Sequence, residues 1–580
     1  MDGPITHQVS DDTVDAVAEA NLSKPGSLTS AKNNGGGNSS QTNISVSLES
    51  KHAWDISRLV RKSWSQYKFA WALGIWAILT GYFIASLTLK RMTQLSDILP
   101  FIFLYVFVSG KMLFAFIGTS FLTRPLSTAS RSIQASAQRI PLRLRYLLGV
   151  VVLVAIVLSV SLTIPENSVG RRIDRMQSFL GIIIIMLAMT ATSTRPRSIQ
   201  WRTVFVGLLL QFCLGCIVIK TKWGNDFFTW LASMASGLLA FANYGTKFLL
   251  GDTIGSLDIF AITVFPAVIF FSAFIQVVQY LGGIQWIIKK IGWAFQQLLG
   301  TSGTESMVAA ASPFLGLSEN VLLVKDYIEH MTCSEIHACM TAGFATISGS
   351  TLQGYIALGV DAKNIITACV MSIPCSLALS KLRYPETEES LTRGVMVDPP
   401  RHTDETNILH ALANGAAIGI NLSLLISANL IAIISLVNLI DFLLTWLGQF
   451  VTIHQLTLEL ILGYVLYPYT WLLGVPHKDI LNVSQLLGLK FITNEFVAYQ
   501  RLTVATSGPA LKTVLSSRGL AIAEFALCGF GNLGSIAIQI GVMGTLAPSR
   551  KTDISRLVLS ACITGSIATT ITAAIVSMVM

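Results

Sequence analysis

Charged residues are scarce in this chain. Asp, Glu, Lys and Arg make up 12% of its 580 residues, whereas an ordinary soluble domain carries about 25%. Hydrophobic residues make up 52%, and apolar runs recur from Phe69 to Met580. Because an apolar helix needs roughly 20 residues to cross a bilayer, these proportions exclude an ordinary soluble enzyme. They predict an all-α polytopic membrane protein.

Cysteine and histidine are also rare, and their positions exclude several kinds of chemistry. The eight cysteines lie within or beside apolar segments, and none belongs to a Cys/His cluster with zinc-finger spacing. No histidine lies in the middle of a clear apolar span, so the base that an intramembrane serine protease would need is missing. We therefore expect no enzyme and no cofactor.

The positive charge that is present indicates how the chain crosses the membrane. The net charge is +9, but the basic residues concentrate in short loops between apolar runs, as the positive-inside rule describes. We interpret them as topology signals and expect no nucleic-acid binding. The basic residues that precede the first span, Phe69 to Leu89, indicate a cytoplasmic N-terminus.

The pattern divides the chain into three parts. Residues 1–65 are rich in Ser, Asn and Gly and are predicted to form a disordered cytoplasmic tail. Residues 66–177 are predicted to contain three transmembrane helices, and residues 178–580 the core. Arg195, Arg197 and Arg202 follow the fourth predicted span, which places them on the cytoplasmic side after an even number of crossings.

Two stretches beyond residue 220 are interrupted by Gly, Ser, Pro and charge. They are Gly300 to Asn320 and Gln485 to Ser507. Irregular backbone at membrane depth is tolerated only where it is buried in protein or lines a polar cavity, and paired interruptions in two halves point to a substrate site. We predict re-entrant hairpins at about 285–325 and about 480–512.

Each interrupted stretch contains one prominent acid, Glu319 in the first and Glu495 in the second. A carboxylate inside a membrane marks a candidate functional site, although hairpins at the interface would leave both acids merely solvated. Uncharged polar residues follow in each half, and Phe530 could pack on a flat ring. These groups are Thr346, Ser348, Ser350, Asn532 and Ser535. They suit a polyhydroxylated organic substrate, but ordinary small-residue helix packing would also explain them.

Five motifs follow one another between residues 316 and 535. They are Gly316-Leu-Ser-Glu-Asn-Val-Leu-Leu-Val-Lys325, Gly343-Phe-Ala-Thr-Ile-Ser-Gly-Ser350, Ser380-Lys-Leu-Arg-Tyr-Pro-Glu-Thr-Glu388, Asn494-Glu-Phe-Val-Ala-Tyr499 and Cys528-Gly-Phe-Gly-Asn-Leu-Gly-Ser535. In this order they resemble the concentrative nucleoside transporters, and the resemblance covers roughly residues 178–580. The three earlier spans resemble the extra N-terminal helices of eukaryotic members.

This resemblance implies a fold and a function. We expect about 11 transmembrane helices plus two re-entrant hairpins, with an inverted-repeat transport domain on a trimeric scaffold. The expected activity is cation-coupled symport of nucleosides, purine or pyrimidine (uridine), into the cell by alternating access at the plasma membrane. The expected partners are the nucleoside, the lipid bilayer and two further copies of the chain. Alternatives that remain open are a passive channel or facilitator, and a sensor that binds nucleosides or nucleobases without transporting them.

The resemblance also implies substrate-binding residues. They are Leu317, Ser318, Glu319, Thr351, Glu495, Phe530, Asn532 and Ser535. Leu317 stands where a Gln is common in the family, and Thr351 where Val is frequent, so the base preference is not carried over.

The coupling ion is either H+ or Na+. Sodium-coupled members hold the ion mainly with backbone carbonyls, at positions that match Ser312, Leu315, Thr346 and Ile347 here. Because Ser312 replaces the usual Asn, the sequence favours proton coupling, with Glu319 as the proton carrier.

Overall fold

The computed structural model describes residues 68–89, 142–163, 170–255, 259–392, 405–452, 456–504 and 510–580, together with a few single positions. Within these residues the regular secondary structure is helical and no strand occurs, which confirms the predicted all-α class. The predicted tail 1–65 lies outside the described residues, as does almost all of the predicted second span, about 99–122.

The chain divides into two units, Met1–Thr128 and Ala129–Met580. The helix described in the first unit is α2 (Lys68–Leu89), which falls on the first predicted span. The second unit begins with α5 (Leu142–Thr163), so this helix groups by its contacts with the core rather than with α2. The sequence had placed it among three N-terminal helices before residue 178.

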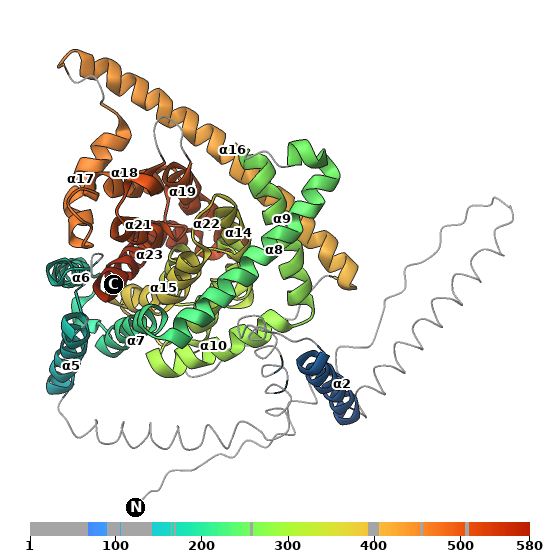
Figure 1. The fold of residues 1–580 in the computed structure, drawn as a ribbon. Helices are drawn as coiled ribbons and strands as arrows, with labels where there is room; N and C mark the ends of the chain where they lie inside the picture. Colours follow the sequence, from blue (N-terminus) through green and yellow to red (C-terminus); the bar gives the residue numbers. More distant parts are fainter. Residues whose placement is uncertain are drawn as a thin grey trace, which may run out of the picture. The chain divides into compact units, whose positions relative to one another are not determined.

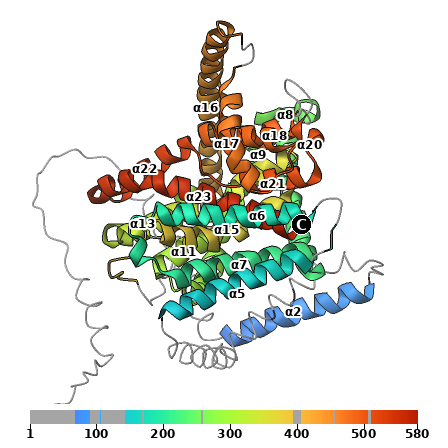
Figure 2. The same cartoon turned by 90° about the vertical axis from the view of Figure 1, so that its left-hand side faces the viewer.

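Three helices open the second unit and lie side by side in Figures 1 and 2. They are α5, α6 (Arg172–Ala191) and α7 (Trp201–Lys220), with the turn η2 (Pro196–Ser198) between the last two. Arg175 of α6 connects this helix to the end of α5 and to the end of the chain. Its guanidinium donates hydrogen bonds to the carbonyls of Ser161 (3.4 Å), Pro165 (3.1 Å) and Met580 (3.3 Å). A fully buried guanidinium therefore meets acceptors from two parts of the chain that are far apart in sequence.

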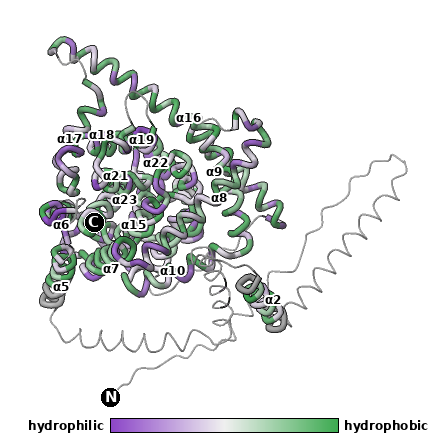
Figure 3. The backbone as a smooth tube through the Cα atoms, viewed as in Figure 1, coloured by the Kyte–Doolittle hydropathy of each residue, from purple (hydrophilic) through white to green (hydrophobic). Residues whose placement is uncertain are grey.

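Five further helices surround the central part of this unit (Figure 1). They are α8 (Lys222–Gly255), α9 (Phe260–Tyr280), α10 (Gly283–Leu299), α16 (Ile408–Gln449) and α17 (Leu458–Leu472). Two glycines let α16 lie directly against α9, because a Cβ on Gly415 or Gly419 would come within 2.6 Å of the α9 backbone. Figure 3 shows hydrophobic residues along most of α16.

The central part contains the same order of elements twice, once for each predicted hairpin. Each half has two short helices joined by a break, then a helix broken in its middle, then one long helix. The first half consists of α11 (Gly303–Ala311), α12 (Leu317–Leu322), η3 (Lys325–His330), α13 (Cys333–Phe344), α14 (Gly349–Ala357) and α15 (Ala362–Arg383). The second consists of α18 (Ile480–Ile492), α19 (Glu495–Thr503), α20 (Leu511–Val514), α21 (Ser517–Leu527), α22 (Leu533–Leu546), η4 (Pro548–Arg550) and α23 (Lys551–Val579).

The hairpins are shorter than expected from the sequence. The first begins at Gly303 rather than near residue 285, because α10 is continuous until Gly300, whose φ of +72° ends it. The second ends its paired helices at Thr503 rather than near residue 512.

Two helices form the centre of the packing. In the apolar 18-residue stretches of α15 and α23, 94% and 89% of the residues are buried, whereas none is buried in the corresponding stretch of α16. Among the described residues, six helices are long and apolar enough to cross a membrane. The total of about 11 crossings stays a prediction.

Candidate functional site

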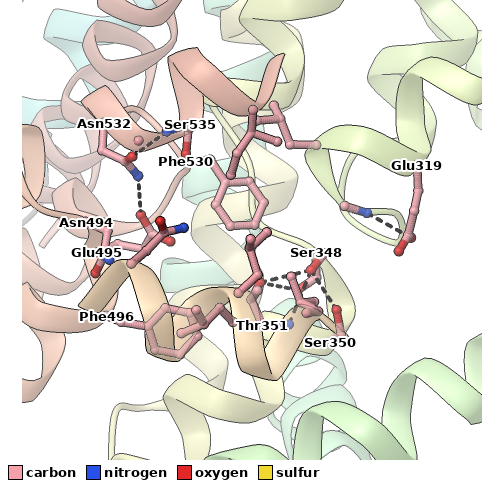
Figure 4. A pocket seen from close by; sticks show the side chains of 18 of the residues that line it. Glu319, Ser348, Ser350, Thr351, Asn494, Glu495, Phe496, Phe530, Asn532 and Ser535 are labelled. Atoms are coloured by element: carbon pink, nitrogen blue, oxygen red, sulfur yellow. Dashed lines mark hydrogen bonds between the residues drawn. The ribbon is translucent and has the colours of Figure 1, made fainter. Parts of the chain in front are cut away.

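Four helix N-termini meet at one cavity, two from each half of the central part (Figure 4). Each has a residue that caps it. Ser348 Oγ accepts the Thr351 N–H at 3.2 Å, Asn494 Oδ1 accepts the Val497 N–H at 3.0 Å, and Asn532 Oδ1 accepts the Ser535 N–H at 2.8 Å. The fourth N-cap is Gly316. Because Ser and Asn start helices well, the residues that break the two helices also supply the polar lining.

Glu495 follows the Asn494 cap and is held from two sides. Tyr355 Oη donates to Glu495 Oε1 at 2.9 Å, and Asn532 Nδ2 donates to Oε2 at 2.9 Å. The carboxylate is 3% exposed, so these donors compensate for its removal from water. Tyr355 lies on α14 and Asn532 precedes α22, so Glu495 connects the two halves.

Glu319 lies on the other side of the cavity, as Figure 4 shows. Its Oε2 accepts a hydrogen bond from the Gly316 N–H at 3.2 Å. Within the described part of the chain no ion pair to Glu319 is present, and the residue is only partly buried. Glu319 is thus a carboxylate with acceptor capacity available to a ligand.

The remaining wall of the cavity is apolar and comes from α16. It is formed by Ile418, Leu422, Leu425, Ile426 and Ile433, with Asn429 among them. Phe530 projects into the cavity from the break before α22 (Figure 4). The cavity measures about 390 Å³, within the range of small-molecule sites. One side therefore offers polar groups from both halves, and the other offers a hydrocarbon surface.

The structure brings most of the predicted substrate residues together. Seven of the eight line the cavity, namely Leu317, Glu319, Thr351, Glu495, Phe530, Asn532 and Ser535. The side chain of Ser318 lies outside the described part of the structure. Sequence reasoning missed the α16 wall, Phe496, and Tyr355, which donates a hydrogen bond to Glu495. Tyr355 follows Ser350 by five residues, and its position on the second part of a broken helix was the available signal.

Two of the four predicted cation positions lie at the first hairpin break and two at the first helix break, and these breaks approach each other where a Cβ on Gly316 would lie 3.7 Å from Ser348 Cβ. Ser312, Leu315, Thr346 and Ile347 are each at most 3% exposed. Asn320 Nδ2 donates to Ser312 Oγ at 2.6 Å, and the buried Asn320 Oδ1 has no hydrogen-bond partner. Oxygen atoms are the ligands that hard cations take, so an amide oxygen without a partner fits a cation here. The potential ligands would be this oxygen and the backbone carbonyls of the four residues.

Three family models match successive parts of the chain. They are described as Na+ dependent nucleoside transporter N-terminus (residues 180–253), Nucleoside recognition (261–361) and Na+ dependent nucleoside transporter C-terminus (364–577). All three fall in the second unit and include both broken helices.

The comparison with a solved structure decides the family. The chain is 34% identical to CNTnw in an inward-facing substrate-bound state, with a TM-score of 0.65, and covers 97% of that chain and 70% of its own length. It belongs to the concentrative nucleoside transporter family. An outward-facing structure of a CNTnw variant matches with a TM-score of 0.67 over 99% of that chain.

Named relatives support the same family assignment. The chain is 41% identical to sodium/nucleoside cotransporter 1 of Oryctolagus cuniculus and 42% identical to sodium/nucleoside cotransporter 2 of Rattus norvegicus, over 70% and 68% of its length. The match covers 63% and 62% of those proteins. The relatives are transporters rather than enzymes, as predicted. Their names give sodium as the coupling ion, so the comparisons do not support the predicted preference for protons.

Proposed function

We propose that this chain carries nucleosides into the cell by cation-coupled symport with alternating access at the plasma membrane. The observation that supports it best is the cavity at which the breaks of the two halves meet, with Glu495 bonded to Tyr355 and Asn532. A site shared by two similar halves near the middle of a membrane protein is the arrangement on which alternating access acts.

A nucleoside matches the two kinds of lining in this cavity. The carboxylate of Glu495 would accept hydrogen bonds from the ribose hydroxyls, and Asn532 and Ser535 would add neutral partners. Phe530 would pack on the sugar or the base. Leu317, Ser318, Glu319 and Thr351 would contact the base, with Glu319 accepting from its amino or imino group.

Movement of the substrate requires one part of the chain to slide past another. In this proposal the two halves share the bound solute, whereas the residues of α16 that line the cavity are apolar except for Asn429. We propose that the halves move together as a transport domain and that α16 belongs to a fixed scaffold. In this proposal three copies of the chain form the scaffold, and the N-terminus lies in the cytoplasm.

Sodium is the coupling ion that the relatives support. The family models and the named cotransporters carry sodium in their descriptions, and the Asn320 oxygen beside Ser312 could replace the amide that Ser312 lacks. A second candidate is the proton. It is favoured by Ser312, which replaces the usual Asn, and by Glu319, whose carboxylate accepts one hydrogen bond from the Gly316 N–H and lines the cavity.

The test is uptake of labelled adenosine and uridine into cells without nucleoside transport, with sodium or choline outside at two pH values. Accumulation above the outside concentration supports the symporter. Equilibration without accumulation would mean a facilitator, and binding without uptake a sensor. Loss of uptake in choline identifies sodium, whereas uptake that rises at low pH and ignores choline identifies the proton.

A further inference from the structure

A second cavity lies away from the central one, between α5, α6, α7 and the end of α23. Its volume is about 240 Å³. On α6 it follows one helix face from Phe179 to Thr190, and on α7 one face from Trp201 to Phe212. Thr190 is the one hydroxyl residue among its lining residues, and that hydroxyl donates to the Met186 carbonyl at 2.8 Å. The groove therefore fits a hydrocarbon and not a nucleoside.

The length of this groove corresponds to one leaflet of a bilayer. Phe179 and Thr190 are 11 residues apart, as are Trp201 and Phe212, and 11 residues of helix rise about 16 Å. The hydrocarbon core of a bilayer is about 30 Å thick. Since α6 and α7 are long and apolar enough to cross a membrane, the groove runs along the direction of lipid tails for about half the membrane.

The two ends of the groove differ. Near Phe179, the Arg175 hydrogen bonds hold α5, α6 and the end of α23 together. At the other end, Thr190 and Trp201 are the residues that flank the connection between α6 and α7. Residues 191–202 contain three arginines and no acid, and the arginines are exposed.

Two of these arginines suit an anionic headgroup. Arg195 borders a separate cavity with Glu386 and Glu388, whereas Arg197 and Arg202 stand on either side of Trp201 in the sequence. Trp201 stacks on Phe205 with a centroid distance of 5.4 Å, and tryptophan prefers the boundary between lipid tails and headgroups. Arginine pairs with phosphate through two parallel hydrogen bonds.

We propose that this groove binds an anionic phospholipid of the surrounding bilayer, with one acyl chain between α6 and α7 and its phosphate at Arg197 and Arg202. Hydrophobic contact holds the tail, and the arginines select for negative charge. The site is separate from the central cavity and does not depend on the nucleoside proposal.

The first experiment measures which lipid the full chain retains. The protein is reconstituted into vesicles of phosphatidylglycerol and phosphatidylcholine with identical acyl chains, extracted in mild detergent, and weighed intact by native mass spectrometry. We expect bound phosphatidylglycerol to exceed phosphatidylcholine at least tenfold. Arg197→Gln with Arg202→Gln should remove most of this preference, because two arginines near a lipid surface account for roughly a 30-fold difference.

The matched control lies at the opposite end of the same helix. Arg171 and Arg172 are exposed arginines at the start of α6, so Arg171→Gln with Arg172→Gln changes the net charge equally. It should leave the preference within twofold of wild type, and Arg197→Lys with Arg202→Lys should keep most of it. Equal losses in the two Gln variants would overturn the proposal, because the effect would then be one of net charge.

A second pair of variants tests the tail. Ile183→Trp fills the groove, whereas Ile184→Trp places the same side chain on a neighbouring residue that does not line it and is 40% exposed. We expect Ile183→Trp to lower retention of the lipid at least fivefold and Ile184→Trp to leave it unchanged. If wild type retains neither lipid, then another segment of the chain or a second copy fills the groove, and the proposal is wrong.

Discussion

The two halves of the central part place similar residues around the cavity but hold their carboxylates differently. In the second half, Glu495 is 3% exposed and accepts hydrogen bonds from Tyr355 and Asn532 at 2.9 Å. In the first half, Glu319 accepts from the backbone of its own helix start at 3.2 Å. One acid is therefore held by both halves, and the other by one backbone hydrogen bond at its own helix start. We call Glu495 the anchor and Glu319 the adaptable contact.

The largest expected effect comes from neutralising the anchor. In Glu495→Gln, the new amide N–H₂ would face either the Tyr355 hydroxyl or the Asn532 amide, both of which now donate. We expect nucleoside uptake to fall at least about 100-fold with the protein still at the surface, as measured by surface biotinylation. Near-normal uptake would remove Glu495 from the site.

The matched variant in the first half is Glu319→Gln. The Gln carbonyl oxygen can still accept the Gly316 N–H, so we expect a smaller loss, about tenfold, from the contact to the base. Uptake of labelled uridine and adenosine checks it beside Glu495→Gln. If the two variants lose activity equally, the distinction between anchor and adaptable contact is wrong.

Tyr355→Phe loosens the anchor without removing its charge. The ring should stay packed, since its centroid lies 4.5 Å from that of Phe496 and 4.9 Å from that of Tyr499. The loss of one hydrogen bond to a carboxylate should raise the KM for uptake roughly 10- to 100-fold. Unchanged thermal unfolding of the purified protein is the control, and an unchanged KM would show that Asn532 alone positions Glu495.

The helix breaks themselves differ in what they tolerate. Gly529 has a φ of +132°, and a Cβ there would come within 2.8 Å of Thr569 and 2.9 Å of the Phe344 carbonyl. Gly529→Ala should therefore cost roughly 1–3 kcal/mol of stability. In the first half a Cβ on Gly349 would come within 2.4 Å of the ring of Phe271, but this neighbour is the far end of a side chain and the φ of Gly349 is not positive. Thermal unfolding of Gly529→Ala beside Gly349→Ala should show the larger drop for Gly529.

The smallest effect concerns selectivity. Leu317 lines the cavity from the first half, and its Cδ1 is 2.6 Å from where a Cβ on Gly343 would lie. Leu317→Gln adds a donor and an acceptor facing the base. We expect the adenosine to uridine uptake ratio to change about two- to fivefold with little change in surface protein. An unchanged ratio would mean that this position does not contact the base.

The sequence predicted the places where the chain becomes irregular better than it predicted the packing around them. Gly, Ser and Asn at Gly316, Ser348, Asn494 and Asn532 mark helix starts by local chemistry alone, and the structure places helix starts there. The start of the first hairpin differed from expectation, because α10 is an uninterrupted amphipathic helix whose end depends on one glycine, Gly300.

The contacts of the site that sequence reasoning missed are non-local. Tyr355 meets Glu495 across 140 residues of sequence, and the apolar wall of α16 has no motif that separates it from any lipid-facing helix. Periodicity shows that a helix is apolar but not which neighbour covers it. Sequence reasoning also missed Asn320. Its amide lies next to Ser312, eight residues earlier in the chain, which is the position where the family usually has an Asn.

The mixed lining of the central cavity has a pharmacological consequence. A nucleoside that carries a bulky apolar substituent would place its sugar at Glu495 and its added group against Leu422 and Ile426 of α16. If the two halves move against α16 as proposed, such a compound would contact both parts at once. It would behave as a blocker rather than a cargo, and its potency would rise with the hydrocarbon surface that it lays on α16.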